Sequence, residues 1–379
     1  CTALKSVVIQ GEVTDIESAA FKNCSGIRNI TVPATVTKIS ASVFDSCSGL
    51  EEVVLSDGIN CIDSRAFYGC VNLKSIKIPK NLTEIGDYAF YDCGLIEKID
   101  LPDGLTKIYD YAFYNCKNLQ ELTIPQSVKL LGGYAFGNCA GLTGIDFNAT
   151  DCEHSGRSPI FTKAGRNGDG ITFIVSKNVE KIPDYLFYGE DDDYSNVTSI
   201  IFEDGSALQN AGILAFFNCM VKNAVIPSCV PINPYELITL RIIGGNEITK
   251  DSYKNAANLI SAELSESVKI IGESAFEGCA KLESINLEGI TDIGEKAFGG
   301  CSVLNKVHLS ENVMSIGISA FENCRLLTEI IIPGELGTLN EYAFDNCASL
   351  KSLVIPSSTT RIGLGALRGC ILLRELTLP

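Results

Sequence analysis

A cysteine recurs at a constant interval along most of the chain, and this regularity constrains the fold more than any other feature. The first seven members of the series are 23 residues apart, and a second series of five follows at steps of 22 or 23. Phenylalanine stands three residues before most of them, and Leu367 fills that slot before Cys370. The cysteines are Cys1, Cys24, Cys47, Cys70, Cys93, Cys116, Cys139, Cys279, Cys301, Cys324, Cys347 and Cys370. Two residue types locked to one period over this length indicate a repeat array.

Other positions keep the same phase. Counted from the cysteine, the unit reads C-x-x-L-x-x-[IVL]-x-[IL]-P-x-x-[VL]-x-x-I-G-x-x-A-F-x-x. The alternating stretch Leu73–Ile78 predicts a short strand with one buried face, and the proline that follows ends it. One such unit cannot bury its apolar face alone, so neighbouring units must stack and share a core. We therefore expect a repeat solenoid, a right-handed β-solenoid or horseshoe of short parallel strands with little regular helix.

The array is predicted to run through the whole chain, residues 1–379, as a single solenoid. Regular repeats occupy residues 1–147 and 256–379, and irregular repeats with insertions occupy residues 148–255. The repeat is already in phase at Cys1 and stops in mid-unit at the other end, which favours a piece cut from a longer protein.

Three places interrupt the irregular region. The segment Asp151–Gly170 is rich in glycine and polar residues and predicts a protruding loop. The acidic run Glu190-Asp191-Asp192-Asp193 adds a few residues, and Glu190 falls in the cysteine slot of its unit. Prolines between Ser228 and Pro234 predict a shortened or broken unit. Insertions in solenoids are often where binding occurs, although neutral loop growth explains them equally well.

The repeat core resembles that of a known family. The segments Ile85–Phe90 and Ile271–Phe276, both I-G-x-x-A-F, together with Cys116–Pro125, are similar to the repeat of the BspA-type leucine-rich repeat family. The resemblance covers nearly the whole chain. Members are mostly surface or secreted proteins of bacteria and some protozoa, linked to adhesion and host contact. The resemblance therefore implies a leucine-rich repeat fold, an extracellular or cell-surface location and a binding role, without specifying a ligand.

The 16 cysteines suggest neither a metal site nor a set of disulfides. Zinc sites favour C-x-x-C pairs, and the closest pair here is Cys61 and Cys70. Cysteines of one column would lie roughly 4.8 Å apart with parallel Cβ atoms, which is a poor geometry for a disulfide. Ala256 occupies the same slot, so we expect a column of buried free thiols that pack as small apolar groups. Cys61, Cys152 and Cys229 lie off the column, and the sequence leaves open whether they are exposed or paired with each other.

Charge and composition argue against several classes of partner and of chemistry. A formal net charge of −16 disfavours nucleic acid and anionic membrane surfaces. No run of about 18 apolar residues predicts a membrane span, so we expect no direct membrane insertion. The chain has only 2 histidines, His154 and His308, and neither has a partner placed by a catalytic motif. Asp191, Asp192 and Asp193 lack the spacing of a calcium loop. We therefore expect no enzymatic activity, no catalytic residue, no metal site and no cofactor.

The strand face offers no repeated chemistry. One outward column runs Val8, Thr31, Val54, Lys77, Asp100, Thr123, Asp146, Asn286, His308, Ile331, Val354, Thr377. The mixture predicts an ordinary solvated face rather than a site for a repetitive polymer.

Two tyrosine columns are more distinctive. Tyr88, Tyr111 and Tyr134 precede the Ala-Phe pair in consecutive units, and Tyr68, Tyr91 and Tyr114 follow the phenylalanine. Stacked at about 4.8 Å per unit, they would form a tyrosine-rich patch able to hold sugar or peptide. The alternative is that these side chains half-bury and only cover the edge of the coil.

The preferred interpretation is a cell-surface or secreted binding or adhesion protein that presents its repeat surface to a protein or glycan partner, possibly host-derived. A structural stalk that displays another domain of a longer protein is the main alternative. An enzyme with its site in the insertions is a third, which acidic or histidine side chains converging beside them would support.

Overall fold

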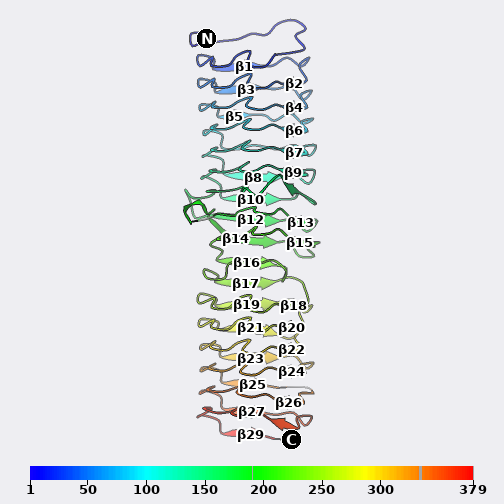
Figure 1. The fold of residues 1–379 in the computed structure, drawn as a ribbon, viewed down its shortest axis with the longest axis vertical. Coiled ribbons are helices and arrows are strands. Elements are labelled where there is room, and N and C mark those ends of the chain that lie inside the picture. The colour runs from blue at the N-terminus through cyan, green and yellow to red at the C-terminus, as the bar shows by residue number, and fades with distance from the viewer. Residues whose placement is uncertain (190, 333–334, 379) are drawn as a thin grey trace. The chain divides into compact units, whose positions relative to one another are not determined.

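The computed structural model describes residues 1–189, 191–332 and 335–378. It contains two compact units, Cys1–Cys219 and Met220–Pro379, and within each unit successive coils of the chain stack through parallel strand pairs (Figure 1). The described residues form no α-helix, and their one helical element is a short 3-10 turn, η1, at Asp191–Asp193. The predicted parallel β-solenoid is therefore confirmed, while the continuity of one solenoid over 1–379 stays a prediction.

In the first unit most coils contribute a strand to one face and a strand of two residues to a second face. The order along the first face is β1-β3-β5 and then β8-β10-β12-β14, with bounds Asn29–Thr31, Glu52–Val54, Ser75–Ile76, Glu121–Ile124, Gly144–Phe147, Ile171–Val175 and Val197–Phe202. The order along the second face is β2-β4-β6-β7-β9-β11 and then β13-β15, with bounds Lys38–Ile39, Cys61–Ile62, Glu84–Ile85, Lys107–Ile108, Leu130–Leu131, Glu153–His154, Lys181–Ile182 and Asn210–Ala211.

The second unit repeats this plan. Its first face has the order β16-β17-β19-β21-β23-β25-β27-β29, with bounds Asn223–Ile226, Thr239–Ile242, Ser261–Leu264, Ser284–Leu287, Lys306–Leu309, Glu329–Ile331, Ser352–Val354 and Glu375–Thr377. Its second face comprises β18-β20-β22-β24 and β26-β28, with bounds Glu247–Ile248, Ile270–Ile271, Asp292–Ile293, Ser315–Ile316, Thr338–Leu339 and Arg361–Ile362.

The third side of each coil is a chain of tight turns that carries the Ala-Phe-x-x-Cys segment. Here the N–H of Phe67 donates to the carbonyl of Ala89 in the next coil at 2.8 Å, and the N–H of Cys70 donates back to Phe67 at 3.2 Å. Coils are thus joined by backbone hydrogen bonds on this side as well, which satisfies the buried polar backbone without a strand.

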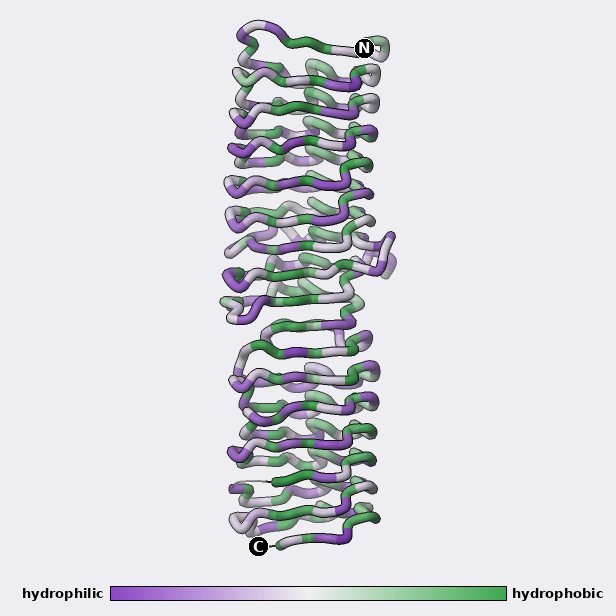
Figure 2. The backbone as a smooth tube through the Cα atoms, turned by 180° about the vertical axis from the view of Figure 1, so that it is seen from behind, coloured by the Kyte–Doolittle hydropathy of each residue, from purple (hydrophilic) through white to green (hydrophobic). Residues whose placement is uncertain are grey.

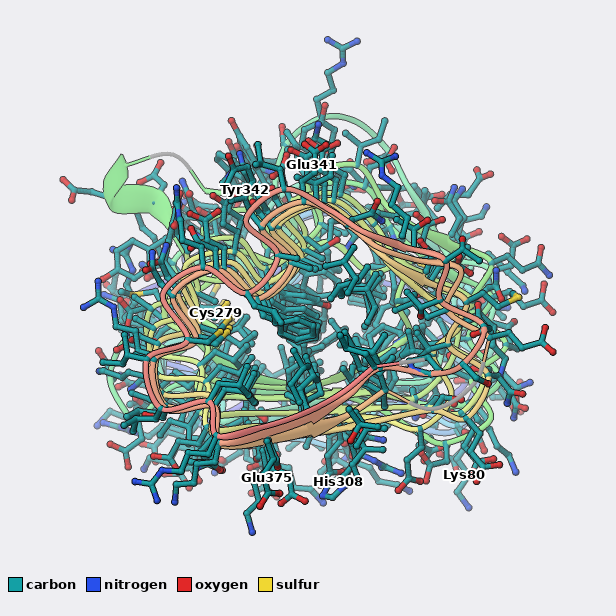
Figure 3. The ribbon with its side chains drawn as sticks, turned by 90° about the horizontal axis from the view of Figure 1, so that it is seen from below. Lys80, Cys279, His308, Glu341, Tyr342 and Glu375 are labelled. Atoms are coloured by element: carbon teal, nitrogen blue, oxygen red, sulfur yellow. The ribbon has the colours of Figure 1, made fainter. Side chains whose placement is uncertain are left out.

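Phenylalanines form the spine of the core, as the repeat predicts. Phe44, Phe67, Phe90, Phe113 and Phe136 are almost fully buried, and their rings stack with centroids 5.1–5.3 Å apart. A view along the coils shows their interior filled with side chains (Figure 3). Where consecutive coils each carry a buried aromatic ring, each ring touches the one above and below and so couples its coil to its neighbours.

The cysteines form a second buried column beside the phenylalanines, and no disulfide joins any of the described cysteines. Most of these thiols donate to a phenylalanine carbonyl in the preceding coil, as Cys70 does to Phe44 at 3.2 Å and Cys93 does to Phe67 at 3.2 Å. The predicted column of free, buried thiols is confirmed. Of the cysteines off this column, Cys61 is half-buried, Cys152 is buried and Cys229 is exposed.

The prediction of a protruding loop over Asp151–Gly170 is wrong. Cys152, Ile160 and Phe161 are fully buried, and the Phe161 ring stacks 5.2 Å from Phe136 within the spine. The strand at Glu153–His154 also pairs with Leu130–Leu131. Most of this segment is therefore a coil of the solenoid, because inward apolar residues at the right places suffice to close a coil despite polar neighbours.

The other two interruptions follow the expectation more closely. The segment at η1 projects from the coil as a polar loop (Figures 2 and 3). Its Asp193 carboxylate pairs with Lys163 at 2.7 Å, and Arg166 donates to the backbone carbonyl of Tyr194 at 3.0 Å. Glu190, expected in the cysteine slot, lies outside the described residues. In the proline-rich segment β16 pairs with β17 at an offset of only 16 residues, Asn223 with Thr239, which confirms a shortened coil.

Candidate binding surface

The six predicted tyrosines lie on the turn side of the coil, where the chain must bend sharply. Most coils bend there through two residues with left-handed backbone conformation, and Tyr88, Tyr111 and Tyr134 occupy the first of these positions with φ of 57°, 55° and 56°. Such a conformation costs roughly 1–2 kcal/mol for a residue with a Cβ atom. The bend is held by hydrogen bonds to the next coil, since the N–H of Tyr88 donates to Asp110 and that of Tyr111 to Gly133, both at 2.9 Å.

The rings form two parallel ladders, which we call the tyrosine ridge. Tyr88, Tyr111 and Tyr134 stack with centroids 4.8 and 4.9 Å apart. Tyr68, Tyr91 and Tyr114 stack at 4.9 and 5.2 Å. The two ladders touch, since Tyr88 lies 5.7 Å from Tyr91 and Tyr111 lies 5.5 Å from Tyr114. The structure therefore brings all six predicted residues together in one half-buried patch.

Stacking decides which part of each ring a partner can reach. The planes of Tyr88 and Tyr111 are within 4° of parallel, and those of Tyr68 and Tyr91 within 8°. A spacing near 5 Å leaves no room for a further ring between them, so the faces of the inner tyrosines are covered by their neighbours. The ridge presents ring edges and hydroxyl groups. Burial raises the pKa of the Tyr91 and Tyr111 hydroxyls, so these phenols stay protonated and both donate and accept hydrogen bonds.

The two ends of the ridge differ. At one end the Arg65 guanidinium lies over Tyr68 at 5.2 Å and over Tyr88 at 5.4 Å, a cation–π contact that places a positive charge beside the phenols. At the other end, Gly137 occupies the position in the next coil that is equivalent to Tyr114. A Cβ atom on Gly137 would come within 2.7 Å of the Tyr114 ring. The ring therefore rests on the glycine backbone.

Further aromatic residues in the same slots were missed at the sequence level. Tyr185 and Tyr188 meet edge to face at 5.5 Å, and Tyr188 stacks on the exposed Phe217 at 5.7 Å. Ile213 and Leu214 beside them are 65% and 39% exposed, which adds an apolar patch to this side of the first unit. The signal was present in the sequence, since Tyr185 and Tyr188 keep the same offsets from Phe187 as Tyr88 and Tyr91 keep from Phe90.

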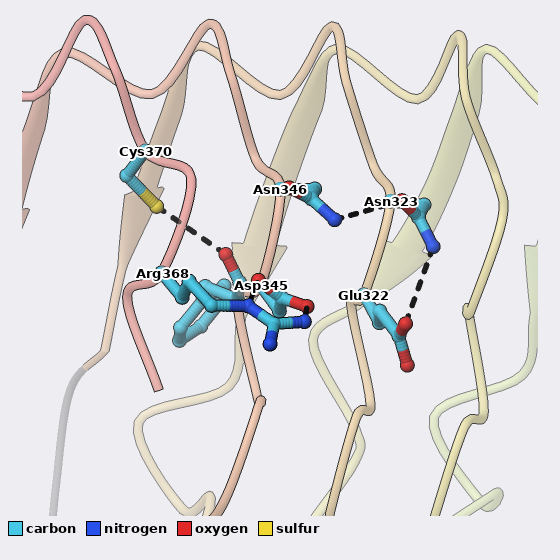
Figure 4. Close-up of polar contacts among 7 residues, drawn as sticks. Glu322, Asn323, Asp345, Asn346, Arg368 and Cys370 are labelled. Atoms are coloured by element: carbon cyan, nitrogen blue, oxygen red, sulfur yellow. Dashed lines mark hydrogen bonds and ion pairs between the residues drawn. The ribbon is translucent and has the colours of Figure 1, made fainter. Parts of the chain in front are cut away.

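The equivalent slots of the second unit carry charged residues, serine, glycine and a single tyrosine, Tyr342, in place of tyrosine ladders. Arg368 forms a two-point ion pair with the fully buried carboxylate of Asp345 (Figure 4). The Arg368 guanidinium also lies over the Tyr342 ring at 5.0 Å. Asn346 donates to Asn323 at 3.3 Å beside it. A ladder of aromatic rings on this side is therefore a property of the first unit, and the fold does not demand it.

A family model for the BspA-type leucine-rich repeat region matches residues 1–120, 39–158, 160–235 and 246–379. These ranges cover nearly the whole described chain. The chain belongs to the BspA-type leucine-rich repeat family. No curated protein matches it.

Solved structures similar to this BspA-type chain include several bacterial proteins. A leucine-rich repeat protein from Bacteroides ovatus is 27% identical, with 96% of this chain and 82% of that chain covered and a TM-score of 0.46. A leucine rich cell surface protein from Faecalibacterium prausnitzii is 23% identical, with 92% and 87% covered and a TM-score of 0.32. The pneumococcal vaccine antigen PcpA is 17% identical, with 93% and 89% covered and a TM-score of 0.32.

The remaining candidate groups of the BspA-type chain do not assemble. His154 is half-buried and its Nδ1 lies 2.9 Å from the Leu131 carbonyl, while His308 points outward from the strand face (Figure 3). Among the described residues, no three His, Cys, Asp or Glu side chains lie close enough to hold a metal ion. Within the same residues, none of the helical structure is long and apolar enough to cross a membrane.

The outward strand column is exposed as predicted. Val54, Ile331 and Val354 are each about half exposed or more, between 49% and 57%. Single apolar residues separated by polar ones are ordinary on a protein surface, so this face keeps the interpretation of a solvated face.

Proposed function

We propose that the chain is a cell-surface or secreted bacterial binding protein that holds a protein partner against its tyrosine ridge. Family membership supports the surface location, since BspA-type proteins are bacterial surface proteins. The observation that carries the binding role is the ladder arrangement itself. Six phenols gathered in one half-buried patch, with Arg65 at its end, match the residue types that dominate protein interfaces.

The geometry of the rings favours a protein over a sugar at this surface. Sugars stack on the open face of an aromatic ring, and here the inner faces are occupied by neighbouring tyrosines 4.8–5.2 Å away. The accessible hydroxyl groups and ring edges suit backbone carbonyls, backbone N–H groups and apolar side chains of a polypeptide. The exposed Ile213, Leu214 and Phe217 on the same side of the unit extend this surface with apolar contact area.

A triple variant, Tyr88→Ser, Tyr111→Ser and Tyr134→Ser, tests the proposal. Serine fits this backbone, because Ser42, Ser274 and Ser319 stand in the same slot with φ of 54–56°. Binding is measured by surface plasmon resonance against a panel of purified host extracellular-matrix proteins. Three interface tyrosines at about 1 kcal/mol or more each predict an affinity reduced roughly 100-fold for any panel member that the unmodified chain binds.

The matched control is Tyr342→Ser, which changes a tyrosine of the same slot and conformation in the second unit, with φ of 56°. It should leave binding unchanged. Circular dichroism and urea midpoints establish that both variants fold. A triple variant that folds and binds as tightly as the unmodified chain, or no binding to any panel member, would remove the ridge as the binding surface.

A further inference from the structure

A polar hollow lies at the corner where three strands of the first unit end. It has a volume of about 290 Å³ and sits beyond the carboxyl ends of β8, β10 and β12. Its polar lining consists of Asp103, Thr123, Gln126, Asn148, Ser176 and Asn178. This corner belongs to the strand face and not to the turn side that carries the tyrosine ridge.

The sequence of the corner explains why a hollow forms there. The residue directly after the last buried strand position is Pro102 or Pro125 in two consecutive coils, but Asn148 and Ser176 in the next two. Because these two are not proline, their N–H groups extend the strand ladder, Asn148 to Ile124 at 3.0 Å and Ser176 to Phe147 at 3.1 Å. These backbone N–H groups are thus hydrogen-bonded, and the short side chains of Asn148 and Ser176 leave an open space beside the backbone.

The polar side chains of the hollow are available to a ligand. Within the described part of the chain, no hydrogen bond or ion pair engages any of the six polar side chains that line it. The neighbouring Ser127 hydroxyl, in contrast, is bound to the Leu105 carbonyl at 2.6 Å. Three carboxamides, two hydroxyls and one carboxylate therefore face water, with both donors and acceptors among them.

We propose that this hollow binds one residue of a neutral saccharide. Carboxamide and carboxylate groups pair with vicinal hydroxyls, donating to one and accepting from the next. Asp103 is the single charged group in the lining and repels anions, which disfavours phosphates, sulfates and acidic sugars. Leu101 and Pro125 supply aliphatic surface for the C–H groups of a sugar ring.

The size of the hollow sets the affinity. Its volume of about 290 Å³ lies just below the range of about 300–1,000 Å³ that is typical of small-molecule pockets. A ligand there must also displace ordered water and gains little apolar burial. A dissociation constant on the order of 1 mM for a single sugar follows, which becomes useful at a cell surface when many copies bind one glycan-coated surface.

Saturation-transfer NMR with D-glucose, D-galactose, D-mannose and N-acetyl-D-glucosamine tests the site, with D-glucuronate as the anionic probe. We expect saturable binding of at least one neutral sugar and at least tenfold weaker binding of D-glucuronate. Asn148→Leu fills the hollow with an apolar side chain, and Asn178→Ala removes one carboxamide. Each should weaken the neutral sugar at least tenfold, because each side chain lines the hollow.

The matched control is Asn312→Ala. Ser310-Glu311-Asn312-Val313 in the second unit repeats the pattern of Ser176-Lys177-Asn178-Val179, and Asn312 is not among the residues that line the hollow. This control and the triple serine variant of the ridge should both bind sugar normally, so the outcome is independent of the protein-binding proposal. The inference is overturned if none of the four neutral sugars binds saturably. It is also overturned if Asn148→Leu and Asn178→Ala both bind like Asn312→Ala, or if D-glucuronate binds as tightly as the best neutral sugar.

Discussion

Removal of one ring from the middle of the phenylalanine spine should be among the most destabilising single changes in the first unit. Phe113 is 1% exposed, and its ring contacts Phe90 and Phe136 at 5.1 Å on either side. Replacement by alanine removes both stacks and leaves a cavity that cannot close, because each neighbouring ring is fixed within its own coil. Core Phe→Ala changes cost about 3–5 kcal/mol, and two lost stacks place Phe113→Ala near 4 kcal/mol.

The end of the spine provides the comparison. Phe21 is only half-buried and stacks on a single neighbour, Phe44, at 5.7 Å, so Phe21→Ala should cost about half as much. Phe113→Leu should cost clearly less than Phe113→Ala, since leucine keeps most of the buried apolar volume and already fills this slot at Leu367.

Urea unfolding followed by circular dichroism measures the three variants. The shift of the earliest transition is compared, because long repeat arrays need not unfold in one step. If Phe113→Ala moves that transition by less than the equivalent of about 1 kcal/mol, or no more than Phe21→Ala does, the spine is not what couples the coils.

Two further predictions concern the thiol column and the ridge. Burial raises the pKa of the Cys139 thiol from its ordinary value near 9.0 to about 12, so the folded chain keeps a proton that the unfolded chain releases above pH 9. Stability is therefore fully present below pH 9 and falls as the pH rises towards 12. At pH 10 this thiol lowers the free energy of unfolding by about 1.4 kcal/mol. Between pH 8 and pH 10, urea titrations should therefore show a fall in the free energy of unfolding that is smaller by this amount in Cys139→Ala than in the unmodified chain. Equal losses would contradict the burial argument. Gly137→Ala should displace the Tyr114 ring, because the new Cβ atom would lie 2.7 Å from it. The near-ultraviolet circular dichroism of the tyrosines should change while the far-ultraviolet signal is kept, and an unchanged near-ultraviolet spectrum would show that the ring does not rest there.

The sequence predicts the buried, inward-facing positions of each coil well, and the reason is physical. Each inward slot must accept a residue that packs against the same slot of the coils above and below. Phe90 and Cys93 therefore recur at one period, and their burial could be predicted without coordinates. Some slots accept several residue types, such as the slot that holds Cys139 in one coil and Ala256 in another. These slots could also be recognised, because they keep a constant offset from the other repeat positions.

The same reasoning did not predict the coils of irregular length. Phe161 follows Phe136 after 25 residues, Phe187 follows after 26 more and Phe216 after a further 29. A coil can lengthen at its outward bends without losing its inward contacts. The assumption of a fixed 23-residue period is therefore wrong for these coils, although their inward side chains still pack in the core. For this reason Asp151–Gly170 was mistaken for a loop and the aromatic pair Tyr185 and Tyr188 was not joined to the ridge.

The candidate sites could be predicted only in part. Spacing alone placed Tyr88, Tyr111 and Tyr134 in one column, but which parts of the rings are open depends on the left-handed bend and on the side-chain torsions. The polar hollow gave no signal at all, because it arises from the absence of proline at Asn148 and Ser176. The effect of having no proline at these positions can be recognised only when the neighbouring coils are in place.

The energetics of the ridge bear on why tyrosine stands there. The left-handed backbone at Tyr88, Tyr111 and Tyr134 costs roughly 1–2 kcal/mol for each residue compared with glycine. Each stacked pair returns about 0.5–1.5 kcal/mol. The two stacked pairs of this column return at most about 3 kcal/mol against about 3–6 kcal/mol for three left-handed residues, so stacking gives tyrosine no advantage in folding stability over the glycine that occupies the same slot at Gly365. Three tyrosines in consecutive coils thus contribute little to the fold, and their distinguishing property is the row of hydroxyl groups and ring edges that they offer to a partner.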